Sequence, residues 1–228
     1  MSALAHVAHW VFDLDNTLYP ADRAIWDAIG ARMTAYVANL TGLDHADAEA
    51  LQERYLMEYG ATVVGLSRLH GVDAHAFMDY VHDVDMSALT PDPALRAAIA
   101  ALPGRSYVYT NGAATYAERL LRQLQLDDLF HAVVALDTLD FAPKPESLSF
   151  RRFIALTGVD PARAAMFEDT PRNLEAAAQF GFATILVRHD EGGDHRVAPR
   201  LPYVDFETWS LARFLREEAA QQPRGRSA

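Results

Sequence analysis

The stretch His9–Thr17, HWVFDLDNT, joins a short apolar run to two acidic residues that lie two positions apart. The run His9–Phe12 predicts a β-strand, because about four to eight apolar residues bounded by polar ones suit a buried strand. Side chains two positions apart on an extended backbone point to the same side, so Asp13 and Asp15 are expected to converge just beyond this strand. An ordinary Asp-Asn turn is the competing explanation.

Five apolar runs of this kind occur along the chain, and helix-length segments separate them after the first. Such alternation predicts parallel βαβ units. The nearly continuous apolar character of the runs fits strands that helices cover on both faces. The predicted fold class is therefore α/β, with a doubly wound parallel sheet. The predicted strands are His9–Phe12, Ser106–Tyr109, Ala132–Leu136, Ala164–Phe167 and Ala183–Val187.

The interval between the first two predicted strands is far longer than the ~2–6 residues that usually connect a strand to a helix. Apolar residues at helical spacing, including Ile25, Ile29 and Met33, predict a helical insertion there. A final helix is predicted over Glu207–Ala220. The expected domains are a catalytic core at residues 1–20 and 92–220, a helical cap at residues 21–91 and a flexible tail at residues 221–228.

The composition excludes several classes of protein. Half of the residues are hydrophobic and 22% are charged, which is typical of a soluble globular protein. The absence of cysteine excludes disulfides, thiolate zinc sites and cysteine nucleophiles. A net charge of -11 argues against a nucleic-acid-binding surface. No run approaches the ~18 apolar residues of a membrane span and no leader is visible, so we expect a cytoplasmic protein without a membrane partner.

A second acidic pair, Glu168 and Asp169, follows the predicted strand Ala164–Phe167. Helix capping explains the next residues, Thr170 and Pro171, but not the two acids. In open α/β sheets the ligand crevice lies beyond the carboxyl ends of the strands, so both acidic pairs are expected at one site. Clustered carboxylates without His or Cys favour a hard divalent cation, and magnesium is the predicted metal. The predicted metal ligands are Asp13, Asp15, Glu168 and Asp169.

Two further segments suit phosphate binding. In TNG, residues 110–112, a hydroxyl and backbone N–H groups precede a predicted helix, although Asn-Gly is also an ordinary turn signal. In APKP, residues 142–145, the ammonium of Lys144 could neutralise both Asp13 and a phosphate, although a lone lysine is usually solvated surface. Together the four sites supply a nucleophile, an acid, oxyanion donors, a cation and metal ligands.

These four motifs resemble those of the haloacid dehalogenase superfamily, and they occur in the same order. They are DLDNT at residues 13–17, TNG at 110–112, KP at 144–145 and EDTPRN at 168–173. The resemblance covers nearly the whole chain. It implies a Rossmann-like core with a helical cap inserted after the first motif, and the predicted insertion has the corresponding position.

The resemblance also implies roles for individual residues. Asp13 would be the nucleophile and a metal ligand, and Asp15 the general acid and base. Asp15 and Asp169 favour phosphoryl transfer, because dehalogenation requires neither a metal nor protonation of an alkoxide leaving group. The further implied roles are phosphate binding for Thr110 and Lys144, metal ligation for Asp169 and secondarily Glu168, and substrate contact for Leu14 and Asn111.

Within the predicted insertion, aromatic and glycine residues form a pattern similar to that of the pyrimidine 5′-nucleotidase branch. An aromatic ring there could stack on a nucleobase. Packing on amphipathic helices is an equally good explanation for the tyrosines. The pattern consists of Tyr55, Tyr59-Gly60, Gly65-Leu66 and His70, together with Leu18-Tyr19-Pro20, and the candidates for base contact are Tyr55, Tyr59 and His70.

The predicted function is hydrolysis of a phosphate monoester, a pyrimidine nucleoside 5′-monophosphate, with Mg²⁺ and an aspartyl-phosphate intermediate. A sugar-phosphate phosphatase and a phosphomutase with the same intermediate are the alternatives, and a non-enzymatic metabolite-binding module is a third. A mutase would release no phosphate without an acceptor, and a binding module should lack a catalytic group. The sequence leaves the oligomeric state open.

Overall fold

The computed structural model of the 228-residue chain describes residues 3–20, 23–189 and 201–221. Within these ranges, strands form one sheet in the order β3-β2-β1-β4-β5-β6, and all neighbouring strands are parallel. This topology confirms the predicted α/β class. The strands are β1 (His9–Phe12), β2 (Arg105–Tyr109), β3 (Ala132–Val134), β4 (Ala164–Glu168), β5 (Ala183–Val187) and β6 (Phe206–Thr208).

The described α-helices lie between these strands and after the last of them. None of them is long and apolar enough to span a membrane. The predicted tail lies outside the described residues, apart from Gln221, which ends the last helix. The helices are α1 (Arg23–Thr41), α2 (His45–Tyr59), α3 (Thr62–His70), α4 (Ala74–Val81), α5 (Pro93–Ala100), α6 (Ala114–Gln123), α7 (Ser147–Thr157), α8 (Pro171–Phe180) and α9 (Leu211–Gln221).

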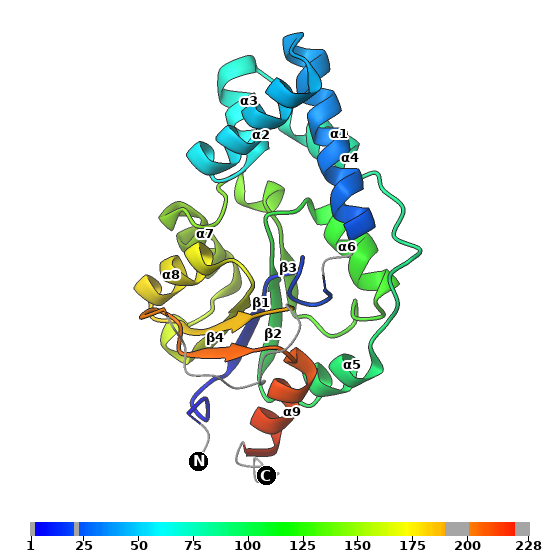
Figure 1. The fold of residues 1–228 in the computed structure, drawn as a ribbon. Helices are drawn as coiled ribbons and strands as arrows, with labels where there is room; N and C mark the ends of the chain where they lie inside the picture. The colour runs from blue at the N-terminus through cyan, green and yellow to red at the C-terminus, as the bar shows by residue number, and fades with distance from the viewer. Residues whose placement is uncertain (1–2, 21–22, 190–200, 222–228) are drawn as a thin grey trace.

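Helices cover both faces of the sheet (Figure 1). Trp10 and Phe12 of β1 lie in an apolar cluster with residues of α5, α6 and α9. Val11 points the other way, into a second cluster with residues of α7 and α8. Because both faces are buried, the strands show no alternation of polar and apolar residues, as the sequence indicated.

Helices α1 to α4 occupy the interval between β1 and α5, and this interval adds no described strand to the sheet. Figure 1 shows them together beyond one end of the sheet. Asp44 and Asp73 cap the starts of α2 and α4 by accepting backbone N–H bonds. Gly60 and Gly71 end α2 and α3 with φ angles of 77° and 67°, which favour glycine. The division into core and cap stays a prediction.

The last part of the chain corrects one sequence prediction. The final helix was expected from Glu207, but Phe206–Thr208 forms the edge strand β6, paired with β5. The hydroxyl of Thr208 then accepts the backbone N–H of Ser210 at 3.1 Å, and α9 begins at Leu211. A three-residue edge strand is too short to give a recognisable apolar pattern.

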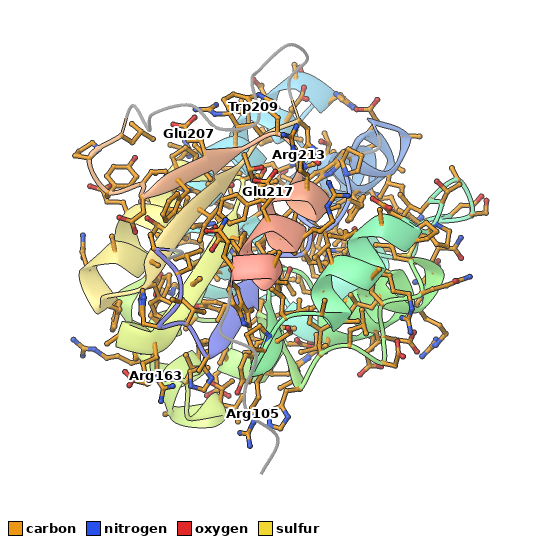
Figure 2. All side chains as sticks on the ribbon, turned by 90° about the horizontal axis from the view of Figure 1, so that it is seen from below. Arg105, Arg163, Glu207, Trp209, Arg213 and Glu217 are labelled. Carbon is orange, nitrogen blue, oxygen red and sulfur yellow. The ribbon has the colours of Figure 1, made fainter. Side chains whose placement is uncertain are left out.

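Figure 2 shows the molecule from below, relative to Figure 1, with several charged side chains labelled. Arg105 lies on β2, Arg163 directly precedes β4, and Glu207 lies on β6. Glu207 of β6 is buried and accepts a bond from Arg188 at 2.9 Å. Arg213 and Glu217 form an exposed pair one turn apart on α9.

Candidate active site

Three carboxylates meet where β1 and β4 end side by side. Phe12 is in register with Phe167, and the backbone N–H of Asp13 donates to the carbonyl oxygen of Phe167 at 2.9 Å. The parallel pairing therefore brings Asp13 next to Glu168 and Asp169. One oxygen from each of these acids lies within 4.8 Å of the others. Asp13 and Glu168 are buried and Asp169 is partly exposed.

Lys144 enters this acidic group from the loop before α7 and is itself only 1% exposed. Its Nζ lies 2.6 Å from Oδ1 of Asp13 and 3.0 Å from Oε2 of Glu168. It also donates to the carbonyl oxygen of Tyr109 at 2.7 Å. Burial alone lowers the pKa of Lys144, but Asp13 and Glu168 outweigh it and raise the pKa above its usual value. The ammonium is therefore held in its charged form.

The acidic group has more negative charge than Lys144 can balance. Burial is the largest cause that raises the pKa of Asp13 well above its usual value, and repulsion from Glu168 adds to it. Burial likewise raises the pKa of Glu168, against the effect of Lys144. Three ionised carboxylates and one ammonium leave two negative charges unbalanced. The donor atoms are all carboxylate oxygens, so the group fits a hard divalent cation.

The remaining contacts distinguish the three carboxylates. Glu168 accepts from Lys144 through Oε2 and from the amide of Asn173 through Oε1 at 2.6 Å, so both of its oxygens are engaged. Asp169 accepts from the amide of Asn16 at 2.7 Å. Asp169 also accepts from the hydroxyl of Thr170 through Oδ1 at 3.2 Å, so both of its oxygens are engaged too. Lys144 contacts Oδ1 of Asp13, and Oδ2 has no hydrogen-bond partner among the described residues. Among these three acids of the described structure, Asp13 alone keeps a carboxylate oxygen without a hydrogen-bond partner.

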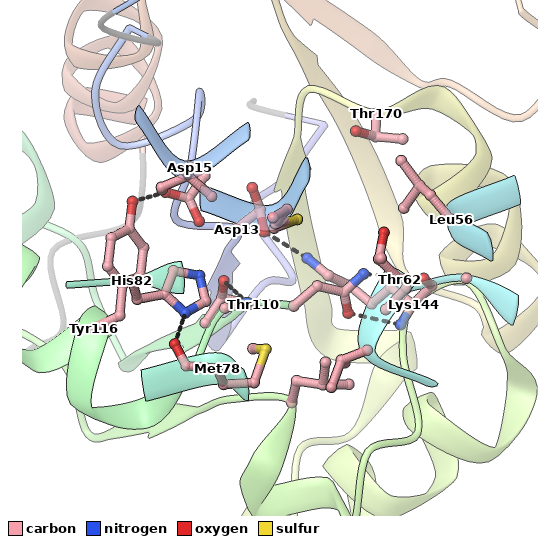
Figure 3. A pocket seen from close by; sticks show the side chains of 18 of the residues that line it. Asp13, Asp15, Leu56, Thr62, Met78, His82, Thr110, Tyr116, Lys144 and Thr170 are labelled. Carbon is pink, nitrogen blue, oxygen red and sulfur yellow. Dashed lines mark hydrogen bonds and ion pairs between the residues drawn. The ribbon is translucent and has the colours of Figure 1, made fainter. Parts of the chain in front are cut away.

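Asp15 is not part of the group of three carboxylates that could hold a metal, and its role as a fourth ligand stays a prediction. Its Oδ1 accepts hydrogen bonds from Tyr19 at 2.6 Å and from Tyr116 at 2.8 Å. In Figure 3, Asp15 turns toward Tyr116, whereas Lys144 approaches Asp13 from the other side. Burial raises the pKa of Asp15, against the effect of the two hydroxyls. Such a carboxyl can hold and release a proton.

The segment after β2 shapes the other side of the site. The hydroxyl of Thr110 accepts the backbone N–H of Gly112 at 2.9 Å. Asn111 uses both ends of its amide on the backbone of Lys144, accepting at 2.9 Å and donating at 3.1 Å. Both side chains line the cavity, but the amide of Asn111 is already engaged in positioning the Lys144 loop. The side chain of Leu14 is buried in the core, and its substrate contact stays a prediction.

These groups open into a cavity of about 340 Å³ between the sheet end and helices α1 to α4. Its sheet side is polar and its helix side is mostly apolar. Trp26 and Leu56 are 43% and 42% exposed although they are large and apolar. Lining residues from the sheet side include Asp13, Asp15, Thr110, Lys144, Glu168, Asp169 and Arg172, and those from the helix side include Trp26, Ile29, Met33, Leu56, Phe77, Met78 and His82.

The three residues predicted to contact a base, Tyr55, Tyr59 and His70, are not among the described residues that line this cavity. The hydroxyl of Tyr55 lies 2.8 Å from Nε2 of His70, and its ring packs edge-on against Tyr59 at 5.8 Å. A Cβ at Gly65 would lie 2.6 Å from the ring of Tyr55. The pattern therefore reflects close packing of α3 on α2, which requires a glycine at that position.

Sequence reasoning missed much of the cavity wall, including Trp26, Leu56, His82, Tyr116 and Arg172. Trp26 lies at helical spacing from Ile29 and Met33 and so carried a signal, whereas nothing in the sequence distinguished Leu56. Arg172 follows the second acidic pair within the same motif, and its Nη1 lies 3.9 Å from the sulfur of Met57 on α2.

The sheet, the insertion after β1 and the acids beyond β1 and β4 define a class of α/β hydrolase. The family model of haloacid dehalogenase-like hydrolases matches residues 8–181. The chain belongs to this family.

Relatives with known names agree with this assignment. Enolase-phosphatase E1 of Streptomyces avermitilis is 29% identical over 87% of this chain and 95% of its own length. Phosphate metabolism protein 8 of Saccharomyces cerevisiae is 25% identical over 77% of this chain, but this chain spans only 60% of that protein. The first of these two relatives is a phosphatase by name.

Solved structures share the fold. A HAD phosphatase from Thermococcus onnurineus has a TM-score of 0.60 at 18% identity, covering 95% of this chain and 99% of that one. L-2-haloacid dehalogenase from Xanthobacter autotrophicus has a TM-score of 0.58 at 20% identity, covering 94% and 99%. Because both chemistries occur among these neighbours, the reaction has to be inferred from the site.

Proposed function

We propose that this protein is a magnesium-dependent phosphomonoester hydrolase in which Asp13 attacks phosphorus and carries the phosphoryl group. The observation that supports this most is the buried contact of Lys144 with Oδ1 of Asp13, at 2.6 Å, beside an excess of carboxylates. The lysine leaves Oδ2 available for attack and supplies positive charge where a phosphate would sit. Asp15 supplies a separate acid at the same cavity.

The proposed first step forms a bond between a carboxylate oxygen of Asp13 and phosphorus, and breaks the bond to the ester oxygen. Asp15 gives its proton to that departing oxygen, which leaves as an alcohol. In the second step Asp15 takes a proton from water, which attacks phosphorus and releases phosphate from Asp13. Lys144 and the hydroxyl of Thr110 would contact the phosphoryl oxygens throughout.

Asp13 and Asp169 would hold Mg²⁺, with Glu168 fixing Lys144 beside them. The bound metal supplies positive charge that offsets the phosphoryl oxygens. The second acid favours phosphoryl transfer over dehalogenation. A halide ion leaves without a proton, so a dehalogenase has no use for the carboxyl that Tyr19 and Tyr116 hold at the cavity.

We further propose that residues 21–91 form a cap on a core of residues 1–20 and 92–220, with the leaving group between them. The apolar side of the cavity comes from α1 to α4, which supports this division. A cavity of about 340 Å³ lies within the usual range of about 300–1,000 Å³ for small-molecule sites. The leaving group is therefore expected to contact the helices of the insertion.

The proposed substrate class is the pyrimidine nucleoside 5′-monophosphates. Tyr55 and Tyr59 do not line the cavity, so the support comes from Trp26 and Leu56, two large apolar side chains of the cavity wall that are partly exposed. A planar base can stack on the ring of Trp26. A sugar phosphate without a base would leave this apolar wall uncovered, which makes it the weaker candidate.

The test measures phosphate release from uridine, cytidine, adenosine and guanosine monophosphates, and from a small sugar phosphate, with Mg²⁺ and after chelation. We expect metal-dependent release that is fastest with the pyrimidine nucleotides. A preference for the sugar phosphate would contradict the substrate assignment alone. Release only when an acceptor is added would indicate a mutase, and no turnover of any ester would favour a binding module.

A further inference from the structure

A pair of tyrosines fixes the orientation of Asp15 from two distant parts of the chain. Tyr19 follows the first acidic motif, and Tyr116 lies on α6, yet their hydroxyls are 3.2 Å apart. Both are within hydrogen-bond distance of the same atom, Oδ1 of Asp15, at 2.6 and 2.8 Å. Burial raises the pKa of both tyrosines, so each hydroxyl stays protonated and donates a hydrogen bond to the carboxylate.

This arrangement makes the two oxygens of Asp15 unequal. Oδ1 accepts from two donors, whereas Oδ2 has no hydrogen-bond partner among the described residues. A carboxyl that delivers a proton to a leaving group must keep the oxygen that carries the proton free and directed at the substrate. With Oδ1 occupied, the proton is confined to Oδ2.

His82, which follows α4 in the insertion, packs against the ring of Tyr116. The ring of His82, at the end of α4, stacks on the ring of Tyr116 with centroids 4.4 Å apart and planes at 29°. Its Nδ1 lies 3.0 Å from the carbonyl oxygen of Met78, a contact drawn in Figure 3. Arg119, one turn beyond Tyr116 on α6, donates to the carbonyl oxygen of His82 at 3.3 Å. The stacked pair is therefore fixed from both helices.

We propose that Tyr19 and Tyr116 are positioning residues that hold Asp15 with Oδ2 toward the leaving group, and that His82 keeps Tyr116 in place. This inference rests on the proposed phosphatase function. It assigns these residues no contact with substrate. Their effect must pass through Asp15, which separates them from residues that bind substrate or stabilise the fold.

The experiment uses a series of substituted phenyl phosphates, from p-nitrophenyl to unsubstituted phenyl, so that the shape of the substrate changes little while the leaving group increasingly needs a proton. Asp15→Asn sets the largest dependence on the leaving group. For Tyr116→Phe and Tyr19→Phe we expect kcat/KM to fall about tenfold more with phenyl phosphate than with p-nitrophenyl phosphate. His82→Ala should show the same trend, and His82→Phe, which keeps a stacked ring, should restore the wild-type pattern.

Two controls separate positioning from general damage. Tyr55→Phe also removes a hydroxyl that bonds a histidine, but outside the cavity, and should leave the leaving-group dependence unchanged. In the Asp15→Asn background, Tyr116→Phe should change the rates by less than about twofold, because the carboxyl group through which Tyr116 acts is already absent. A uniform loss across all esters in Tyr116→Phe, or a large further loss in that background, would overturn the inference.

Failure of this inference and failure of the proposed function give different results. If the wild type hydrolyses none of the phenyl phosphates, the phosphatase proposal fails and the inference fails with it. If the wild type hydrolyses them and Asp13→Asn does not, but the tyrosine variants keep the wild-type leaving-group dependence, the inference alone is wrong.

Discussion

Replacing Lys144 by methionine tests how the acidic group is stabilised. Methionine has a similar length and fits an apolar environment, but it leaves Asp13 and Glu168 without their buried counter-charge. At 2.6 and 3.0 Å, and with an effective dielectric constant of about 20, each ion pair is worth about 5–6 kcal/mol before desolvation is counted. Desolvation offsets much of this, and removing one partner of a buried pair typically costs about 3–5 kcal/mol.

We therefore expect Lys144→Met to lower the free energy of unfolding by about 3–5 kcal/mol at neutral pH in the absence of metal. For a chain of this size that corresponds to a fall in Tm of about 6–20 °C. Mg²⁺ should recover part of the loss, because it binds the folded protein and supplies positive charge. Urea denaturation with and without Mg²⁺ measures both effects.

The matched control is Arg213→Met, which breaks the exposed pair with Glu217 on α9 and should cost less than about 1 kcal/mol. Asp13→Asn gives the opposite change in charge. It removes a carboxylate whose pKa burial and Glu168 raise, so it should be at least as stable as the wild type. Lys144→Met with the stability of the wild type in metal-free buffer would refute this account of the acidic group.

Three further predictions concern turnover, selectivity and pH. Asp13→Asn should show no phosphate release while unfolding cooperatively; release near the wild-type rate would indicate another nucleophile. Trp26→Ala should lower kcat/KM for pyrimidine nucleotides by about 5–150-fold, the equivalent of one lost base–aromatic stack, and should lower kcat/KM for a sugar phosphate less. The control Leu69→Ala removes an exposed apolar side chain outside the cavity and should change kcat/KM for neither substrate. Burial lowers the pKa of His82 from 6.5 to about 4, so the unfolded chain binds this proton at a higher pH than the folded chain. The contribution of neutral His82 to the free energy of unfolding is therefore complete above pH 6.5, and about 3 kcal/mol of it is lost as the pH falls to 4. His82→Phe should flatten that part of the stability profile in urea denaturation, and an unchanged profile would contradict it.

The sequence predicted the acidic group because parallel pairing places the ends of neighbouring strands together. Asp13 and Glu168 are far apart in the chain, but the apolar runs before them identify β1 and β4. Parallel pairing of these two strands then brings their carboxyl ends, and the acids that follow, next to each other. The same reasoning placed Thr110 after β2. These residues needed no knowledge of side-chain packing.

Other parts of the site depend on packing that periodicity does not reveal. Aromatic residues at helical spacing give the same sequence pattern whether they line a cavity or fill a core. For Tyr55, the close approach of Gly65 to its ring shows that the side chain is packed in the core of the insertion. The orientation of Asp15 depends on Tyr116, a residue 101 positions away. Short edge strands such as β6 are stabilised by their neighbour rather than by their own pattern.

The central claim is that Asp13 carries the phosphoryl group, and the most direct measurement is mass spectrometry of acid-quenched protein. Asp15→Asn is the protein to use, with p-nitrophenyl phosphate and Mg²⁺, because a good leaving group needs little protonation while loss of the base slows release of phosphate from the enzyme. We predict one added phosphoryl group on the peptide that contains Asp13, and none in Asp13→Asn. Release of p-nitrophenol without any adduct at early times, or an adduct on a different residue, would contradict the proposed mechanism.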